Sequence, residues 1–498
     1  MMPDVLTKPT DALYLAIDQG GHASRVMVFD TRGDVVAQAI REVAVFHPQP
    51  EWVEQDGDAL ELSIRQALEE VAGILGDNCE AIVAAGLATQ RSNVVCWDRA
   101  TGKVLSPVIS WQDRRASQWM QQFESHGRRI RQITGLLPTA HYGVSKLVWC
   151  WESLPEVQDA HAKGALAWGP LSSFLMYRLL DEHPLLVDPA NASRTLLWDM
   201  KQRQWSEELL TLFGITSDNL PESVPSRHNF GGLNIGGFKI PLTVCTGDQS
   251  AALFAFGKPV QGVASINIGT GAFLQTTISE ENIAENSGQP STDRLLKSVV
   301  WSDEEHSMVV SEATVNGAGS AVKLIENECD ISPQTVRQFL PDWLRSASNI
   351  PLYLNGVSGL GAPFWVPDFV SRFVGSGEPS EKMVAVIESI VFLLQVNLEE
   401  MKNNKIYLHK VVVSGGLSVL DGLCQRLADL SGLPVSRPQQ CESTAKGLAF
   451  LVSGLETSWQ AGETGNVNPD IFNPAPNDNL VLRYRRWRGE LEAELGHG

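Results

Sequence analysis

The chain has 498 residues, a hydrophobic share of 43% and a formal net charge of −19. This length predicts about two to four domains, and the composition is that of a globular protein with large cores. The negative charge argues against nonspecific binding to nucleic acid or to an anionic membrane surface, because such binding needs excess positive charge. No run of about 18 apolar residues occurs, so no transmembrane helix is expected.

Cysteine and histidine are dispersed along the chain. The seven cysteines form no Cys-x-x-Cys pair, and the ten histidines form no close pair. We therefore expect reduced, mostly buried thiols and no zinc site. The first ten residues lack the basic start and the apolar core of a signal peptide, so a cytoplasmic protein is expected.

Strands and helices are predicted to alternate in the N-terminal half. Residues 12–45 form a meander of apolar runs separated by glycine turns. Residues 57–75 carry apolar side chains at helical spacing, at Leu60, Ile64, Leu68, Val71 and Leu75. The other elements expected here are a strand at 82–87, a hairpin of 94–97 with 104–107, and helices at 114–132 and 144–153.

The C-terminal half is predicted to repeat this plan. A strand at 242–245 ends in Gly247-Asp248-Gln249, and a helix follows at 250–256. Strands that alternate with helices in both halves predict an α/β fold. We place the domain boundary near residue 255, which gives domains 1–255 and 256–498. The later elements expected are a hairpin from about 263, a strand at 410–413, a loop at 462–479 and a basic amphipathic helix at 481–495.

Two glycine turns far apart in the chain resemble halves of one phosphate clamp. Residues 15–22 and 265–271 each predict a strand followed by a tight turn, and a second apolar run follows each turn. Glycine lets backbone N–H groups approach an anion closely. Asp18 could hold Mg²⁺, directly or through water. Each turn alone is most often an ordinary hairpin, but the pair indicates a duplicated domain closing around a nucleoside triphosphate.

The order of motifs resembles that of the FGGY carbohydrate kinases, and within this family it is most similar to the glycerol kinases. The resemblance covers residues 13–456, and its clearest stretches are residues 17–20, 51–56, 88–91, 110–115, 145–149, 247–254, 269–271 and 359–363. It implies two actin-like ATPase (ribonuclease H-like) domains around a central cleft. It also implies ATP and Mg²⁺ as cofactors, with acceptor binding in domain 1–255 and nucleotide binding in domain 256–498.

Asp248 is the main catalytic candidate. In this family the Asp of Gly-Asp-Gln is the expected general base, and a carboxylate at the end of a buried strand is held rigidly. Its alternative role is an ordinary helix N-cap. By the same resemblance, Asp18 and Asp248 are the candidate metal ligands, and Gln249 is expected to bind a hydroxyl of the acceptor.

The resemblance also assigns the acceptor and nucleotide sites. For several of these residues an ordinary role stays open: a surface charge for Arg91, core packing for Trp111 and Phe273, turn formation for the glycines, and pairing with a carboxylate for Arg25. The candidate acceptor residues are Arg91, Ser92, Trp111, His141, Tyr142, Asp248, Gln249 and Phe273. The candidate nucleotide residues are Gly20, Gly21, His22, Arg25, Gly269, Thr270, Gly271, Gly317, Gly319, Gly415 and Gly416.

The chain departs from the family pattern at both sites. Gly21 and His22 stand where the family usually has two threonines that follow Asp-Gln-Gly. Ser92 replaces the Glu of glycerol kinases, and His141 replaces their Tyr, although Tyr142 is adjacent. A smaller Ser and a shifted aromatic ring would admit a longer polyol or a ketose, because a site shaped for hydrogen bonds rejects acceptors that leave its groups unpaired.

These features predict an enzyme that phosphorylates a hydroxyl of a small polyol or sugar at the expense of ATP. The alternatives are a pentulose kinase such as a xylulokinase, and a non-catalytic protein of the same fold that binds sugar or nucleotide. The expected partner is the small-molecule substrate, without nucleic acid or membrane. Family members assemble in different ways, so a homodimer and a homotetramer both stay open.

Overall fold

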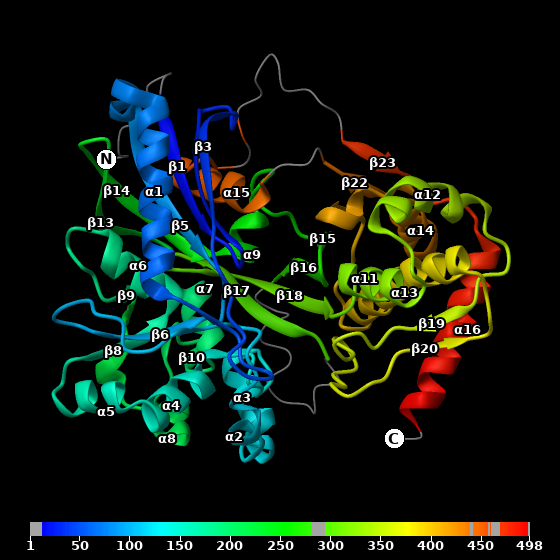
Figure 1. Cartoon of the computed structure of the whole chain (residues 1–498), viewed down its shortest axis with the longest axis horizontal. Helices are drawn as coiled ribbons and strands as arrows, with labels where there is room; N and C mark the ends of the chain where they lie inside the picture. The colour runs from blue at the N-terminus through cyan, green and yellow to red at the C-terminus, as the bar shows by residue number, and fades with distance from the viewer. Residues whose placement is uncertain (1–11, 280–293, 439–441, 457–458, 460–468, 497–498) are drawn as a thin grey trace. The chain divides into compact units, whose positions relative to one another are not determined.

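The computed structural model describes residues 12–279, 294–438, 442–456, 459 and 469–496. The chain forms two compact units (Figure 1). Unit 1 comprises residues 1–259, 297–309 and 441–466, and unit 2 comprises 260–296, 310–440 and 467–498. The first division between the units falls after residue 259, and the chain then returns twice to unit 1. The boundary near residue 255 stays a prediction.

A six-stranded sheet forms the centre of unit 1. Its strand order is β13-β14-β5-β1-β2-β3, in which β1 pairs antiparallel with β2 and parallel with β5. Strand β14 pairs parallel with β5, so the carboxyl ends of β1, β5 and β14 lie at the same edge of the sheet. The strands are β1 Leu13–Gln19, β2 Ala23–Phe29, β3 Val35–Glu42, β5 Ile82–Thr89, β13 Arg227–Ile235 and β14 Phe238–Gly247.

Alternate side chains along β1 pack into two different hydrophobic cores. Leu15 and Ile17 belong to a core with helix α1 (Gly57–Leu75), whereas Tyr14 and Ala16 belong to one with helix α15 (Ser443–Ser453). This follows from the two-residue period of a strand. Figure 1 shows α1 and α15 beside this sheet. Asp18 shares the parity of Tyr14 and Ala16, which places it on the α15 face.

Helix α1 has the bounds that the sequence predicts. Its apolar stripe is buried, and Asp56 caps it by accepting a hydrogen bond from the N–H of Ala59 at 3.0 Å. The predicted helix at 114–132 is wrong: residues 117–121 and 127–134 form two short helices, joined by a 3₁₀ turn. Asp113 accounts for the late start of the first of these helices, because its carboxylate accepts the backbone N–H groups of Val53 and Arg115 and fixes a loop before Ser117.

Smaller elements complete unit 1. Strands β4, β7, β6 and β8 form a four-stranded sheet in that order. Helix α9 begins at Asp248, two residues before the predicted helix. The elements are β4 Glu54–Gln55, η1 Gly76–Ala81, β6 Val94–Asp98, β7 Val108–Ile109, α2 Ser117–Gln121, η2 Glu124–His126, α3 Gly127–Thr134, α4 Gly143–Ser153, α5 Pro155–Ala162, β8 Leu166–Pro170, α6 Leu171–Leu179, β9 Leu186–Val187, α7 Pro189–Ala192, η3 Ser193–Thr195, β10 Trp198–Asp199, β11 Gln204–Trp205, α8 Glu207–Phe213, η4 Ser217–Asn219, β12 Glu222–Ser223 and α9 Asp248–Ala252.

The central strands of the second sheet repeat the arrangement of the first. Strand β15 pairs antiparallel with β16 and parallel with β21, as β1 does with β2 and β5. The sheet order is β17-β18-β16-β15-β21-β22-β23. Its strands are β15 Val263–Ile268, β16 Ala272–Ile278, β17 Leu296–Ser302, β18 Ser307–Val315, β21 Lys410–Ser414, β22 Val435–Arg437 and β23 Asp470–Phe472.

Helices cover the core of unit 2. Almost every residue of the central part of α13 is buried, and Trp487 of α16 packs in the same core. Residues 462–468 of the predicted loop lie outside the described residues, and β23 occupies part of the remainder. The other elements are α11 Gly319–Glu328, α12 Pro333–Ser346, β19 Leu352–Leu354, β20 Arg372–Val374, α13 Pro379–Asn403, η6 Gly416–Val419, α14 Asp421–Ser431 and α16 Asp478–Leu495.

Two expectations from composition concern the chain as a whole. In the described ranges, no helix is both long enough and apolar enough to cross a membrane. Six of the seven cysteines fall in these ranges, and all six are free thiols; Cys441 lies outside them.

Candidate active site

Asp18 closes β1 in unit 1 and lies next to Arg25 across the hairpin. Arg25 Nη1 lies 3.6 Å from Asp18 Oδ2, and Arg25 Nε lies 3.4 Å from a carboxylate oxygen of Glu442. Glu442 is the residue that precedes α15. Arg25 therefore pairs with two carboxylates, which is one of the two roles expected for it.

Burial, and then the charges of neighbouring carboxylates, perturb the pKa of Asp18. Burial raises the pKa of its carboxyl to about 7, and the charges of Asp248 and Glu442 act in the same direction against Arg25. Such a set of oxygen ligands fits Mg²⁺, which takes one or two carboxylates and keeps several waters. Within the described ranges, no three His, Cys, Asp or Glu side chains are grouped to hold a metal ion. A magnesium ion here would therefore depend on Asp18, Asp248, water and phosphate oxygens.

Two glutamine side chains hold the turn after β1. Gln90 Nε2 donates to the carbonyl of Gly20 at 3.2 Å and to Gln55 Oε1 at 2.9 Å. Gln55 Nε2 donates in turn to the carbonyl of Gly21 at 3.1 Å. His22 is exposed, and Gly20 and Gly21 are half-buried. The turn is thus fixed by side-chain amides from elsewhere in unit 1, and its contact with a nucleotide stays a prediction.

Asp248 lies where β14 ends and α9 begins. Gly247, not Asp248, occupies the N-cap position, and Asp248 Oδ1 accepts the N–H of Gln249 at 2.7 Å. Burial raises the pKa of the Asp248 carboxyl, and the positive charges of Arg91 and Arg194 oppose this rise. The carboxylate is therefore held in one direction and has two cations nearby.

Arg91 depends on the glycine that precedes Asp248. Arg91 is buried, and a Cβ atom built on Gly247 would overlap its Cγ and Cδ. Gly247 thus lets the stem of Arg91 pass close to the backbone of β14. The alternative role of Arg91 as a surface charge does not hold, because the side chain is buried and its charge acts on Asp248.

Ser92 is strained and its hydroxyl is unsatisfied. Its φ is 65°, a left-handed conformation that is uncommon for non-glycine residues. Its buried Oγ and the buried Nδ2 of Asn93 have no hydrogen-bond partner among the described residues. Asn93 Oδ1 accepts the N–H of Trp111 at 2.8 Å. A buried unpaired polar group costs roughly 1–3 kcal/mol, so these two adjacent groups indicate a place where a polar ligand would be accommodated.

Aromatic and cationic side chains gather around His141. The ring of Trp111, which is 38% exposed, lies 5.5 Å from the His141 ring, and the Tyr142 ring lies 4.9 Å from it. The guanidinium of Arg194 lies 5.3 Å from the Tyr142 ring. Burial and the charges of Arg194, Lys146, Arg114 and Arg91 hold the pKa of His141 well below its ordinary value, so its imidazole is neutral.

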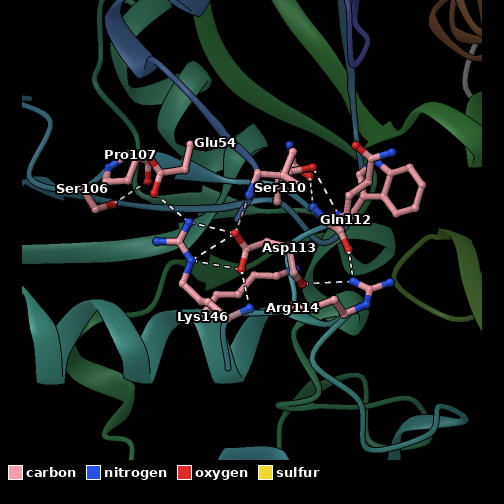
Figure 2. Close-up of polar contacts among 12 residues, drawn as sticks. Glu54, Ser106, Pro107, Ser110, Gln112, Asp113, Arg114 and Lys146 are labelled. Carbon is pink, nitrogen blue, oxygen red and sulfur yellow. Dashed lines mark hydrogen bonds and ion pairs between the residues drawn. The ribbon is translucent and has the colours of Figure 1, made fainter. Parts of the chain in front are cut away.

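Asp113 organises the loop that carries Trp111 (Figure 2). Its carboxylate accepts the N–H of Val53 at 2.7 Å and pairs with Arg115 Nη2 at 2.8 Å. Arg115 also pairs with Glu54 at 2.7 Å, and its side chain, 1% exposed, lies over the rings of both Trp52 and Trp149. Arg114 Nη1 donates to the carbonyl of Trp111 at 2.9 Å. The loop is therefore held by hydrogen bonds and ion pairs with other segments of unit 1.

Two residues near this site had no role in the sequence analysis. Arg194 is buried and donates to Ser298 Oγ at 2.7 Å, and its charge acts on both Asp248 and His141. Lys146 is wholly buried on α4. The motif at 145–149 marked Lys146 as part of the resemblance, whereas no local pattern distinguishes Arg194 from a surface arginine.

In unit 2 the turn after β15 is held by the backbone of residues that follow β18. The carbonyl of Thr270 accepts the N–H groups of Ala318 and Ser320, both at 3.0 Å, and the carbonyl of Gly269 accepts that of Gly319 at 2.9 Å. Gly269 N–H closes the turn on Gly271 at 2.8 Å. Thr270 itself is exposed. The turn brings its hydroxyl and the start of α11 together.

The candidate glycines of unit 2 fall into two groups. A Cβ atom on Gly271, Gly317 or Gly319, or on Gly415 with its φ of 90°, would come within 3.0 Å of neighbouring atoms of unit 2. Packing alone explains these four. A Cβ on Gly269 would meet only ordinary contacts at 3.9 Å, and one on Gly416 would meet nothing within 4 Å. Gly269 and Gly416 therefore leave open space in which a ligand could approach the backbone.

Phe273 lies in β16, opposite Asn267 of β15, and is half-buried. Both neighbours of Phe273 in β16, Ala272 and Leu274, point into the core of unit 2. The two-residue period of the strand therefore turns Phe273 to the other face of the sheet. The expected role of its ring against the acceptor stays a prediction.

Known proteins similar to this chain were found at both the sequence and the structural level. The chain is 32% identical to the glycerol kinase of Bordetella parapertussis, and the match covers 97% of each protein. It is 30% identical to the glycerol kinase of Thermoanaerobacter pseudethanolicus, over 97% of this chain and 98% of the relative. A crystal structure of Plasmodium falciparum glycerol kinase with ADP has the same fold, with a TM-score of 0.86, 24% identity and coverage of 97% and 98%.

Further matches agree with this family. A ligand-bound xylulose kinase from Lactobacillus acidophilus shares the fold at a TM-score of 0.79, with 18% identity and 98% coverage of both chains. The model of the N-terminal domain of the FGGY family of carbohydrate kinases matches residues 13–255, and that of the C-terminal domain matches residues 264–453. The chain therefore belongs to the FGGY family of carbohydrate kinases.

Proposed function

We propose that Asp248 is the general base with which this ATP-dependent carbohydrate kinase accepts the proton of the acceptor hydroxyl. One observation carries this proposal: the Asp248 carboxylate is oriented by the N–H of Gln249 at the strand-to-helix junction, close to two buried arginines. Phosphoryl transfer needs a positioned nucleophile and neutralised charge more than covalent chemistry. Asp248 would orient the acceptor hydroxyl and accept its proton, and Arg91 and Arg194 would help to neutralise the charge.

We propose that Asp18 and Asp248 would hold the Mg²⁺ ion of the nucleotide. When bound, Mg²⁺ neutralises charge that develops on the transferred phosphoryl group. The repulsion that raises the Asp18 pKa supports this proposal, because a cation would relieve it. Arg25, now paired with Asp18 and Glu442, would keep the carboxylate of Asp18 directed along the hairpin.

The nucleotide is proposed to bind at the turn of unit 2. The exposed hydroxyl of Thr270 supports this proposal, because phosphate oxygens need donors at close range. The open space at Gly269 and Gly416 would let a ligand approach the backbone there. Gly271, Gly317, Gly319 and Gly415 would shape the site through packing. Gly20, Gly21, His22 and Arg25 are the proposed nucleotide residues of unit 1.

The proposed acceptor is a small polyol of the glycerol class. The curated relatives named glycerol kinases support it. Arg91 and Gln249 would bind hydroxyl groups, and Trp111 and Tyr142 would contact carbon atoms. Phe273 of unit 2 is a separate candidate for such a contact. A ketose such as a pentulose is the second candidate, because Ser92 is smaller than the Glu of glycerol kinases and its buried hydroxyl has no partner among the described residues.

Location and assembly are also proposals. The net charge of −19 and the free thiols of the described cysteines support a cytoplasmic protein that binds neither nucleic acid nor a membrane surface. For assembly, the alternatives are a homodimer and a homotetramer.

An acceptor panel tests the proposed function. ADP release would be measured with the full chain, MgATP and a series of polyols and ketoses, with glycerol and xylulose included. We expect turnover above the background without acceptor for at least one short polyol or pentulose. Nucleotide binding with flat rates for every acceptor would contradict the proposal and favour a non-catalytic binding protein.

A further inference from the structure

Lys146 is a buried lysine without a carboxylate partner. Lys146 is 0% exposed, although lysine is almost never fully buried unless it is paired. Its ammonium Nζ donates to two backbone carbonyls, that of Ser92 at 3.1 Å and that of His141 at 2.6 Å. No acidic side chain forms an ion pair with it in the described part of the chain. The ammonium is therefore held by the main chain of two other segments.

These two segments carry the residues that distinguish this acceptor site. Ser92 follows the end of β5, and His141 precedes α4, so the two are far apart in sequence. Ser92 is held at a φ of 65°, which a serine adopts only when its surroundings impose it. The link through Lys146 supplies such a constraint, because its Nζ fixes the direction of the Ser92 carbonyl.

The surroundings of Lys146 oppose its charge. Burial and the charges of Arg114 and Arg115 hold the pKa of Lys146 well below its ordinary value, and Asp113 only partly compensates. A hydrophobic side chain of similar length would avoid this electrostatic conflict. Stability alone therefore gives no reason for a lysine here, whereas two carbonyls that must be held in register do.

We propose that Lys146 is a positioning residue that joins the segments of Ser92 and His141 and so sets acceptor selectivity. The inference rests on the proposed acceptor site. Lys146 itself is not assigned any contact with the acceptor. Its effect passes through the main chain of Ser92 and His141, and it should leave the nucleotide site in unit 2 unchanged.

The test compares K146M, which keeps the length but removes all donors, with K146Q, which keeps an amide donor. K163M is the matched control, because Lys163 is exposed on the surface of unit 1. Steady-state kinetics of ADP release would give kcat and KM for the best acceptor and for MgATP. We expect K146M to raise the acceptor KM about tenfold or more. We expect the KM for MgATP to stay within about twofold, with K146Q intermediate and K163M unchanged.

Other outcomes would overturn the inference. An unchanged acceptor KM in K146M, or equal losses for acceptor and MgATP, would show a merely structural lysine. If K146M does not fold, the same criteria apply to K146Q. If the wild-type protein is inactive with every acceptor, the proposed function fails instead. Binding then tests Lys146. The increase in melting temperature that a compound of the acceptor panel causes in the wild type should be smaller in K146Q, and an equal increase would refute the role of Lys146.

Discussion

The turns after β1 and β15 share one backbone plan, yet they are stabilised by different groups. In unit 1 a carboxylate, Asp18, closes the strand, and the side chains of Gln55 and Gln90 hold the turn carbonyls. In unit 2 the turn carries the hydroxyl of Thr270, and backbone N–H groups of residues 318–320 hold its carbonyls. Both hairpins continue into the same arrangement of antiparallel and parallel neighbours.

The difference suggests a division of tasks between the two repeats. A metal ion needs negatively charged oxygen ligands, which only the turn of unit 1 provides through Asp18. A phosphate group needs donors, and the turn of unit 2 provides one in the exposed hydroxyl of Thr270. A duplicated fold can thus keep its hydrogen-bonded frame while the two copies take on opposite charge preferences. The predictions below test whether this division holds.

The largest effect among the changes to the two turns is expected for Asp18→Asn. Removal of this carboxylate should raise the Mg²⁺ concentration needed for half-maximal activity by about 10–100-fold, in the range observed for lost metal-site interactions. Binding of ATP without metal should not weaken. Titration of activity with Mg²⁺ measures the effect, and Asp34→Asn, at an exposed turn residue, is the control. An unchanged magnesium requirement would contradict the proposed role of Asp18 as a metal ligand.

Thr270→Val should affect the nucleotide and not the metal. Loss of one hydrogen bond to a charged phosphate should raise the KM for MgATP about tenfold. The magnesium requirement at saturating ATP should stay unchanged. Thr270 is exposed, so the melting temperature should not fall. If Thr270→Val instead altered the magnesium requirement, the two turns would not have separate roles.

A pair of glycine variants separates ligand space from packing space in unit 2. Gly416→Ala places a methyl group where no neighbour lies within 4 Å, so it should keep its stability while MgATP binds several-fold more weakly. Gly317→Ala would force its Cβ within 2.7 Å of Val357 and should destabilise the fold by about 1–3 kcal/mol. Calorimetric titration and thermal unfolding distinguish the two. Equal affinities for wild type and Gly416→Ala would place the nucleotide elsewhere.

The smallest expected effect is on stability as a function of pH. The folded-state pKa of Asp18, about 7, lies above its ordinary value of 3.8. The cost of ionising Asp18 in the ligand-free fold therefore grows as the pH rises from 3.8 and is complete above about 7. Asp18→Asn should therefore have a higher melting temperature than wild type at pH 8. The difference should shrink toward pH 5, as wild-type Asp18 becomes protonated. A difference that is independent of pH would show that the charge of Asp18 is not under strain.

Local sequence patterns were sufficient for most of the frame. The amphipathic spacing and the Asp56 cap of α1 act within a few residues, and both glycine hairpins form where the sequence places them. The helix expected at 114–132 begins only at Ser117, because Asp113 bonds to Val53, about 60 residues away, and fixes the preceding residues in a loop. Periodicity carries no information on such a contact.

The site was less accessible to sequence reasoning for a related reason. The burial of Arg194 and Lys146 depends on contacts with distant segments, and an isolated Arg or Lys resembles a surface charge in sequence. The two classes of glycine in unit 2 are likewise identical in sequence. Only coordinates show that Gly317 is packed against Val357, whereas Gly416 has open space.

The role of Asp248 is tested most directly by rapid-quench measurement of phosphoryl transfer in Asp248→Asn under single-turnover conditions, together with equilibrium binding of MgATP. The amide keeps the shape and can still accept the N–H of Gln249, but it cannot take the proton of the alcohol. We expect the transfer rate to fall about 1,000-fold, with the MgATP affinity within about threefold of wild type. A transfer rate close to that of wild type would contradict the assignment of Asp248 as the base.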